Sequence, residues 1–183
     1  PDTLPVLENI IDDLCRVFPG EYIHLGADEI APDAWTKSPA IDMLRSENNL
    51  KNSKDVASWF INKLSKRVES NNKKTAAWQE AEDGRHQDHK IDKLLFSWQN
   101  LESGISLARQ GFKVVLCPAE HIYFDMAQSR NYADRGANWA AVIPFEKTLD
   151  WSIIPENEPE LEANVEGIQG HLWCETILKD SEM

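Results

Sequence analysis

Short apolar runs with the character of β-strands alternate with helix-like stretches along most of this chain. The strand-like runs fall at residues 22–25, 74–80, 94–99, 112–117 and 167–173. Between them, apolar residues recur at helical spacing in three stretches, 7–17, 56–68 and 101–110. Such alternation is typical of parallel strands joined by right-handed crossovers through helices. The sequence therefore predicts an α/β fold with parallel strands.

Capping residues and chain breakers indicate where helices begin and end. Ser38-Pro39 predicts the start of a brief helix, and Asn52-Ser53 predicts the start of a longer one. The core face predicted for that longer helix comprises Val56, Phe60, Leu64 and Val68. Pro19-Gly20 ends the first helix, so a strand beginning near Tyr22 can follow at once.

The composition favours a globular domain that binds an uncharged ligand. With 183 residues, of which 42% are hydrophobic and 27% charged, we expect residues 1–183 to form a single domain with a sizeable core. The net charge of −12 disfavours a nucleic-acid partner. No membrane partner is predicted, because no apolar run is long enough to span a bilayer, and no signal-peptide pattern is visible.

The three cysteines are predicted to be buried free thiols. Cys15, Cys117 and Cys174 each lie in a stretch predicted to be helix or strand, and their number is odd. Zinc and redox motifs need paired spacings that this chain lacks. We therefore predict no metal site and no cofactor.

Two adjacent carboxylates, Asp28 and Glu29, follow the first strand-like run. In folds of alternating strands and helices, catalytic side chains gather at the carboxyl ends of the strands. Two ionised neighbours repel each other, so a half-buried pair raises the pKa of at least one carboxyl group, which suits a general acid. A solvated turn, where such pairs are also common, remains the alternative interpretation of these two residues alone.

Tryptophans mark the ends of three further strand-like runs. They are Trp78, Trp98 and Trp173, with Glu80 and Glu175 close by. A single tryptophan in such a place is usually part of the core, but three at one edge of a sheet, beside carboxylates, describe an aromatic pocket with polar anchors. This composition is typical of a carbohydrate site.

Several motifs resemble those of family 20 glycoside hydrolases, the β-N-acetylhexosaminidases and chitobiases. Residues 24–29, His-Leu-Gly-Ala-Asp-Glu, resemble the family signature His-x-Gly-Gly-Asp-Glu, with Ala27 in place of the second glycine. Further matches follow in the family's order: the strand-end tryptophans Trp78 and Trp98, Tyr123-Phe124-Asp125, Gly136-Ala137-Asn138-Trp139 and Trp173-Cys174-Glu175. The resemblance implies that Ala27 matters only if the backbone there needs a positive φ.

The resemblance also implies a particular part of a particular fold. The family's catalytic domain is an eight-stranded (β/α) barrel, with the Asp-Glu pair after the fourth strand. The chain therefore resembles a partial TIM barrel running from helix 3 through strand 8, without the first three strands. Such a piece has an open sheet edge, which favours self-association, and it lacks part of the sugar-binding wall, which implies weak or no activity on its own.

The implied reaction is hydrolysis of terminal N-acetyl-β-hexosaminides with retention, in which the substrate's own acetamido oxygen attacks the anomeric carbon. By resemblance, Glu29 is the general acid and then the base, Asp28 orients the acetamido group, and Tyr123 donates to its oxygen. The other implied substrate contacts are enclosure by Trp78, Trp98 and Trp173, hydroxyl binding by Asp125 and Glu175, and a platform for the next sugar at Trp139. His24 and His171 are expected to be buried, hydrogen-bonded strand residues.

Two other interpretations stay open. A non-catalytic fragment that binds N-acetylhexosamines or chitooligosaccharides would need the tryptophans but not the acid pair. An unrelated α/β scaffold would leave the order of the motifs unexplained. By resemblance, the parent enzyme is expected to be periplasmic, secreted or lysosomal.

Overall fold

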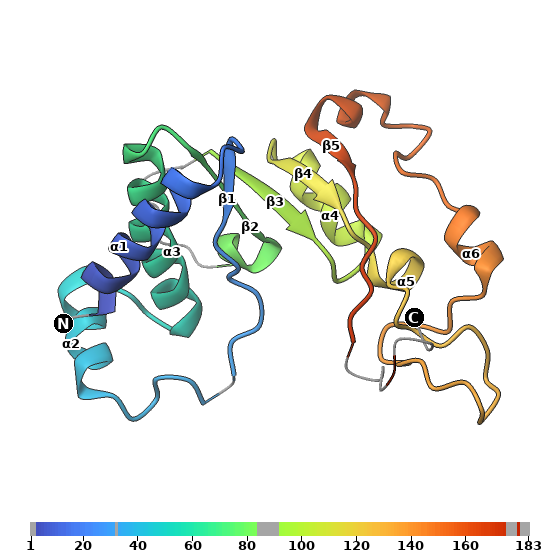
Figure 1. Ribbon diagram of the computed structural model, residues 1–183, viewed down its shortest axis with the longest axis horizontal. Coiled ribbons are helices and arrows are strands. Elements are labelled where there is room, and N and C mark those ends of the chain that lie inside the picture. Colours follow the sequence, from blue (N-terminus) through green and yellow to red (C-terminus); the bar gives the residue numbers. More distant parts are fainter. Residues whose placement is uncertain (1–2, 32, 84–91, 175–178, 180–183) are drawn as a thin grey trace. The chain divides into compact units, whose positions relative to one another are not determined.

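The computed structural model describes residues 3–31, 33–83, 92–174 and 179. Its strands are β1 (Tyr22–His24), β2 (Lys74–Trp78), β3 (Lys93–Ser97), β4 (Lys113–Leu116) and β5 (Val165–Ile168). The main helices are α1 (Thr3–Val17), α2 (Pro39–Asn48), α3 (Ser53–Ser70) and α4 (Leu101–Arg109), and the short ones are η1 (Gln79–Glu82), α5 (Ala119–Ile122), α6 (Phe145–Leu149) and η2 (Pro159–Asn164) (Figure 1).

The strands follow one another in the sheet in chain order, from β1 to β5. The pairings β1–β2 and β4–β5 are both parallel. This arrangement confirms the predicted α/β fold. The chain divides into two compact units, residues 1–95 and 96–183, with the boundary inside β3. Each unit is described by itself below.

In the first unit, α1 and α3 pack together over the paired strands β1 and β2. Their shared core consists of Ile11, Cys15, Ile23, Leu64 and Val68. At the rim, the guanidinium group of Arg67 in α3 donates two hydrogen bonds to the carboxylate of Asp12 in α1. The predicted core face of α3 is found, with Val56, Leu64 and Val68 buried and Phe60 packed against the cluster.

Local capping explains where the helices of this unit begin. The Ser38 side chain accepts a hydrogen bond from the N–H of Ile41, and the Asn52 side chain accepts one from the N–H of Asp55 (2.9 Å). Each bond satisfies a backbone donor that the first turn of a helix leaves without an intrahelical partner. Both caps lie where the sequence predicts them.

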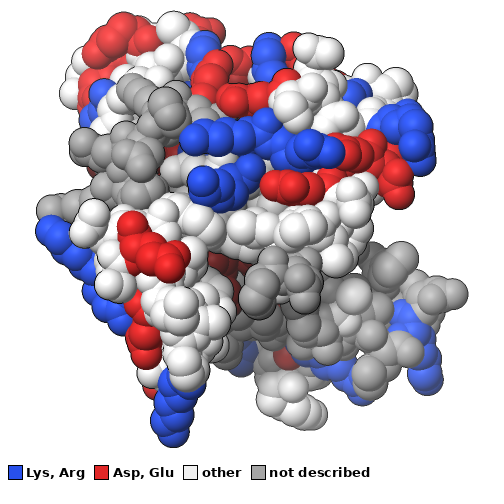
Figure 2. All heavy atoms as spheres, turned by 90° about the vertical axis from the view of Figure 1, so that its left-hand side faces the viewer, with Lys and Arg blue, Asp and Glu red and all other residues white. Residues whose placement is uncertain are grey.

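One face of α1 remains uncovered by the described residues of this unit. Val6, Ile10, Leu14 and Val17 recur at helical spacing and are 37–65% exposed. The side of the molecule shown in Figure 2 combines acidic and basic clusters with a band of uncharged side chains. An apolar stripe of this kind on a helix is usually covered by another element or another chain.

In the second unit, α4 packs closely against β4. A Cβ atom at Gly104 would lie only 2.3 Å from a methyl carbon of Leu116, so any larger residue would force the buried Leu116 side chain to move. Ile105, Val114 and Leu116 are buried around the contact. Cys117 is also buried, which raises the pKa of its thiol to about 12. The Cys117 thiol is therefore protonated at neutral pH.

Two sequence predictions about the C-terminal part were wrong. The fifth strand covers Val165–Ile168 and not residues 167–173, because its partner β4 ends at Leu116, the residue that pairs with Ile168. Cys174 is exposed and not buried, because it lies in the irregular segment beyond this strand.

Within the described ranges, every helix is too short or too polar to cross a bilayer.

Candidate functional site

In the first unit, the acid pair follows β1 at a turn that its backbone pairing fixes. The N–H of Leu25 donates to the carbonyl of Ala76 (2.9 Å), and the N–H of Trp78 donates to the carbonyl of Gly26 (2.8 Å), so pairing with β2 continues past the end of β1. Gly26 and Ala27 then both adopt positive φ angles, +76° and +77°. Two such residues in succession turn the chain sharply before Asp28.

Asp28 and Glu29 are exposed in this chain, contrary to the expectation of half burial. The reason is that β1 ends at His24, so the pair lies in the loop after the turn and not at the strand end itself. The loop leaves both carboxylates accessible to a ligand.

His24 lies against Trp78, the tryptophan at the end of β2. The two rings meet edge to face, with centroids 5.2 Å apart, and the His24 Nδ1 atom accepts a hydrogen bond from the N–H of Gly26 (3.1 Å). The predicted hydrogen bonding is therefore found, but the predicted burial is not, because the His24 side chain points to the exposed face of the strand. The Nδ1 bond helps to hold the turn that precedes Asp28.

Ala27 occupies a backbone conformation that an L-residue with a Cβ atom adopts only with strain. We expect Ala27→Gly to stabilise the chain by about 1 kcal/mol, since relief of this strain exceeds the added entropy of the unfolded glycine. Urea unfolding would measure the change. The control is Ala31→Gly, an exposed alanine outside the positive-φ residues, which should leave stability unchanged or lower it. A lower midpoint for Ala27→Gly than for the original chain would contradict the strain argument.

In the second unit, four of the predicted site residues form one aromatic cluster. The ring of Trp139 meets those of Trp98 and Tyr123 edge to face, each at 5.8 Å between centroids. Tyr123 and Trp173 lie 6.3 Å apart. Tyr123 is 4% exposed, whereas Trp139 and Trp173 are 57% and 40% exposed. The cluster thus combines a fixed interior ring with accessible indole faces.

Backbone contacts bring these rings together. The N–H of Ala119 donates to the carbonyl of Trp98 (2.8 Å), which ties the end of β3 to the start of α5. Tyr123 directly follows α5 and pairs with His171 in an isolated parallel bridge. The segment after β5 is thereby held beside Tyr123, which places Trp173 in the cluster.

Asp125 is buried next to the cluster, with 8% of its surface exposed, and its carboxylate contacts the backbone of Trp173. Its carboxylate accepts a long hydrogen bond from the N–H of Trp173 (3.5 Å), and its carbonyl accepts one from the N–H of Ala137 (2.8 Å). Asp125 therefore joins the segment that carries Trp173 to the loop that carries Trp139.

The loop that carries Trp139 is held by its own hydrogen bonds. The N–H groups of Gly136, Ser129 and Gln128 donate to the Asp134 carboxylate and hold its pKa below the usual value. A Cβ atom at Gly136 would lie 2.4 Å from backbone atoms of Ala127, so the loop closes through a glycine. These contacts fix the backbone that leads into Trp139.

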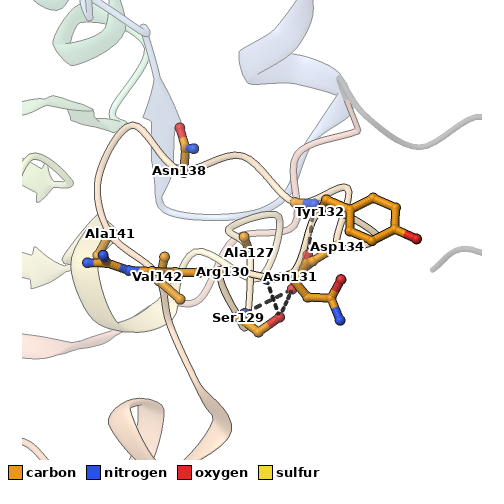
Figure 3. Close-up of a pocket in the computed structure, with 10 residues that line it drawn as sticks. Ala127, Ser129, Arg130, Asn131, Tyr132, Asp134, Asn138, Ala141 and Val142 are labelled. Carbon is orange, nitrogen blue, oxygen red and sulfur yellow. Dashed lines mark hydrogen bonds between the residues drawn. The ribbon is translucent and has the colours of Figure 1, made fainter.

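The same loop surrounds an open pocket of about 670 Å³ (Figure 3). Its polar side chains include Arg130, Asn131 and Asn138, and Asn138 directly precedes Trp139. The predicted site residues that the structure describes do not line this pocket. The polar groups can hydrogen-bond to hydroxyl-rich ligands.

The structure thus places the predicted site residues in two groups. Asp28, Glu29 and Trp78 belong to the first unit, and the aromatic cluster with Asp125 belongs to the second. Glu175 lies outside the described residues. Among the described His, Cys, Asp and Glu side chains, no three are grouped so that they could hold a metal ion.

His171 is a member of the aromatic cluster that the sequence did not assign to the site. Its ring lies 5.1 Å from that of Tyr123 and stacks on that of Trp173, with 5.4 Å between centroids and 2° between planes. The only sequence signal is its spacing of two from Trp173, which in an extended segment places both side chains on one face.

Comparison with known proteins matches residues 1–183 to the catalytic domain of glycosyl hydrolase family 20. A β-hexosaminidase of Vibrio furnissii is 31% identical over 186 residues, which cover 100% of this chain and 30% of that protein. A β-hexosaminidase of Vibrio vulnificus is 28% identical, with 97% of this chain and 25% of that protein covered. The chain therefore spans less than a third of the length of these relatives.

The fold matches a solved structure of the same family. The exo-β-N-acetylglucosaminidase of Vibrio harveyi, determined in complex with N-acetylglucosamine, superposes with a TM-score of 0.88 at 31% identity. The match covers 100% of this chain and 29% of that protein. An inactive variant of the same enzyme, with one aspartate changed to alanine, gives the same score. The five parallel strands therefore correspond to part of a (β/α) barrel.

Proposed function

Since the chain belongs to glycosyl hydrolase family 20, we propose that it supplies one part of the active site of a β-N-acetylhexosaminidase. The substrates would be terminal, non-reducing N-acetyl-β-hexosaminides, including chitooligosaccharides. The observation that carries the proposal is the cluster of Trp98, Tyr123, Trp139 and Trp173, in which a buried phenol ring lies beside accessible indole faces. Such faces stack on sugar rings, and the phenol hydroxyl is a hydrogen-bond donor.

The acid pair would perform the chemistry. Glu29 protonates the leaving glycosidic oxygen and afterwards removes a proton from the attacking water. Asp28 orients the 2-acetamido group and stabilises the positive charge that grows on its nitrogen as the acetamido oxygen attacks the anomeric carbon. The loop position of both residues supports these roles, because it leaves each carboxylate accessible to a sugar.

The aromatic residues and the phenol would hold the acetamido group for attack. Trp78, Trp98 and Trp173 enclose its methyl group, while Tyr123 donates to its oxygen. Restricting this group to one orientation keeps its oxygen in place for intramolecular attack, which lowers the activation free energy substantially. Asp125 and Glu175 would bind ring hydroxyls, and Trp139 would support the next sugar.

A second candidate function is binding without cleavage. It is supported by the observation that the aromatic cluster with Asp125 lies wholly within residues 96–183, separate in the chain from the acid pair. This part alone could hold an N-acetylhexosamine or a chitooligosaccharide. The acid pair favours the enzyme, because a binding module has no use for a proton donor.

A chimera tests the proposed function directly. This chain would replace the matching 186-residue segment of the Vibrio furnissii β-hexosaminidase. We expect the chimera to hydrolyse a fluorogenic N-acetylglucosaminide, and the same chimera with both Asp28→Asn and Glu29→Gln to be inactive. Hydrolysis that survives the double substitution would contradict the proposal, provided that circular dichroism shows both proteins folded.

The isolated 183-residue chain is expected to self-associate and to have little or no activity. The apolar stripe of α1 is exposed, and β1 is the first strand of the sheet. Unpaired strand edges and apolar helix faces favour contact with a second copy. Light scattering combined with the fluorogenic assay would measure both properties. A stable monomer with the turnover of an intact family member would contradict this expectation.

A further inference from the structure

His171 is the ring that touches both Tyr123 and Trp173. It is stacked on Trp173 with 2° between the ring planes, and it is tilted by 57° against Tyr123 at 5.1 Å. Tyr123 and Trp173 are farther from each other, at 6.3 Å between centroids. The imidazole ring therefore has the shorter contact with each of the two rings.

The backbone of His171 is also fixed at this place. Its N–H donates to the carbonyl of Ile122 (3.0 Å), and its carbonyl accepts a hydrogen bond from the N–H of Phe124 (2.6 Å). These two bonds flank Tyr123 on both sides. The preceding residue, Gly170, lies close to Phe124, since a Cβ atom there would be 2.5 Å from the Phe124 ring.

We propose that His171 is a positioning residue, whose ring sets the separation and the angle between Tyr123 and Trp173 in the sugar-binding wall. The inference rests on the proposed function, in which Tyr123 donates to the acetamido oxygen and Trp173 encloses the acetamido methyl group. Removing the ring leaves the two backbone bonds in place, since they involve only main-chain atoms. Its loss therefore affects the relative orientation of the two aromatic rings more than the path of the chain.

The ring acts in its neutral form at neutral pH. Burial lowers the pKa of His171 below its usual value of 6.5, while the nearby Asp125 carboxylate opposes this shift. The titratable phenol of Tyr123 also contacts the ring. Since the unfolded chain binds this proton at a higher pH than the folded chain, acidification below about pH 6.5 weakens the arrangement.

Three substitutions, made both in the isolated chain and in the chimera, separate positioning from general stability. His171→Ala removes the ring, and His171→Phe keeps a planar ring that cannot take a proton. The matched control is His121→Ala, because His121 stacks on Trp151 in the same unit at 5.1 Å and 18°. Each chain would be labelled with 5-fluorotryptophan, and the Trp173 fluorine resonance would be assigned by its loss in Trp173→Phe.

The first readout needs no ligand. In the original chain, we expect the chemical shift of the Trp173 resonance to change with pH. In His171→Phe, the resonance should stay at the neutral-pH position of the original chain at every pH. In His171→Ala, it should shift already at neutral pH. The second readout is titration with N-acetylglucosamine of the chimera described above, with each substitution introduced in turn. We expect about twofold to tenfold weaker binding for His171→Ala, the worth of one aromatic contact, and near-original binding for His171→Phe and His121→Ala.

An unchanged Trp173 resonance in His171→Ala would overturn the inference, and so would unchanged affinity in that variant. Weakening by His121→Ala to the same extent would also overturn it, because the effect would then be general destabilisation. If the chimera that carries this chain shows no binding, the proposed function fails, while the Trp173 resonance of the isolated chain still decides whether His171 positions the ring.

Discussion

Glu29→Gln in the chimera is expected to reduce hydrolysis of an N-acetylglucosaminide with a poor leaving group, such as another sugar, by about 10²- to 10⁴-fold. The glutamine side chain keeps the shape of the glutamate but cannot transfer a proton to the glycosidic oxygen. A substrate with an activated aryl leaving group needs no protonation, so its bond cleavage should slow far less. Comparing kcat/KM for the two substrates measures the difference.

The control for this substitution is Asp33→Asn. Asp33 is an exposed carboxylate in the same loop region, four positions after Glu29, and no catalytic role falls to it. Asp33→Asn should leave kcat/KM unchanged for both substrates. Equal losses on the two substrates for Glu29→Gln would remove Glu29 from the role of general acid.

The second large effect is expected when the substrate is altered and the protein is left unchanged. Replacing the 2-acetamido group by a hydroxyl removes the nucleophile, because the proposed reaction uses no nucleophile from the chain. An intramolecular group in place for attack has an effective concentration of about 10⁵ to 10⁸ M. We therefore expect the chimera to hydrolyse a glucoside at least about a thousandfold more slowly than the matching N-acetylglucosaminide.

A graded series makes this prediction sharper. Fluorine atoms on the acetyl methyl group withdraw electrons from the carbonyl oxygen while adding little volume. The rate should therefore fall stepwise from the acetyl to the trifluoroacetyl compound. A rate that does not depend on fluorine content, or comparable turnover of a glucoside, would contradict attack by the substrate's own oxygen.

Local signals account for the parts of the fold that the sequence predicts well. The starts of α2 and α3 depend on Ser38 and Asn52, whose side chains bond to backbone groups only three residues away. The end of β5 could not be predicted in this way. It depends on the register against β4, which pairs Ile168 with Leu116, the last residue of that strand, and this register follows from tertiary packing.

In the candidate site, too, the sequence predicts some features, while others depend on tertiary packing. The order of the motifs indicates which residues to consider, and the structure brings Trp98, Tyr123, Trp139 and Trp173 into one cluster. The exposure of Asp28 depends on what covers the loop, which the local sequence does not encode. His171 was missed because a histidine two positions before a tryptophan has no special meaning until a third ring, that of Tyr123, packs against both.

The central claim is that this chain helps to stabilise a cyclic intermediate formed by the substrate's acetamido group. The most direct test is to measure the affinity of the chimera for a thiazoline analogue of that intermediate and for N-acetylglucosamine. Complementarity to the reacting state predicts that the thiazoline binds at least about 100-fold more tightly, and that Asp28→Ala removes most of this preference. Equal affinity for the two ligands, or a preference that Asp28→Ala leaves intact, would contradict the account.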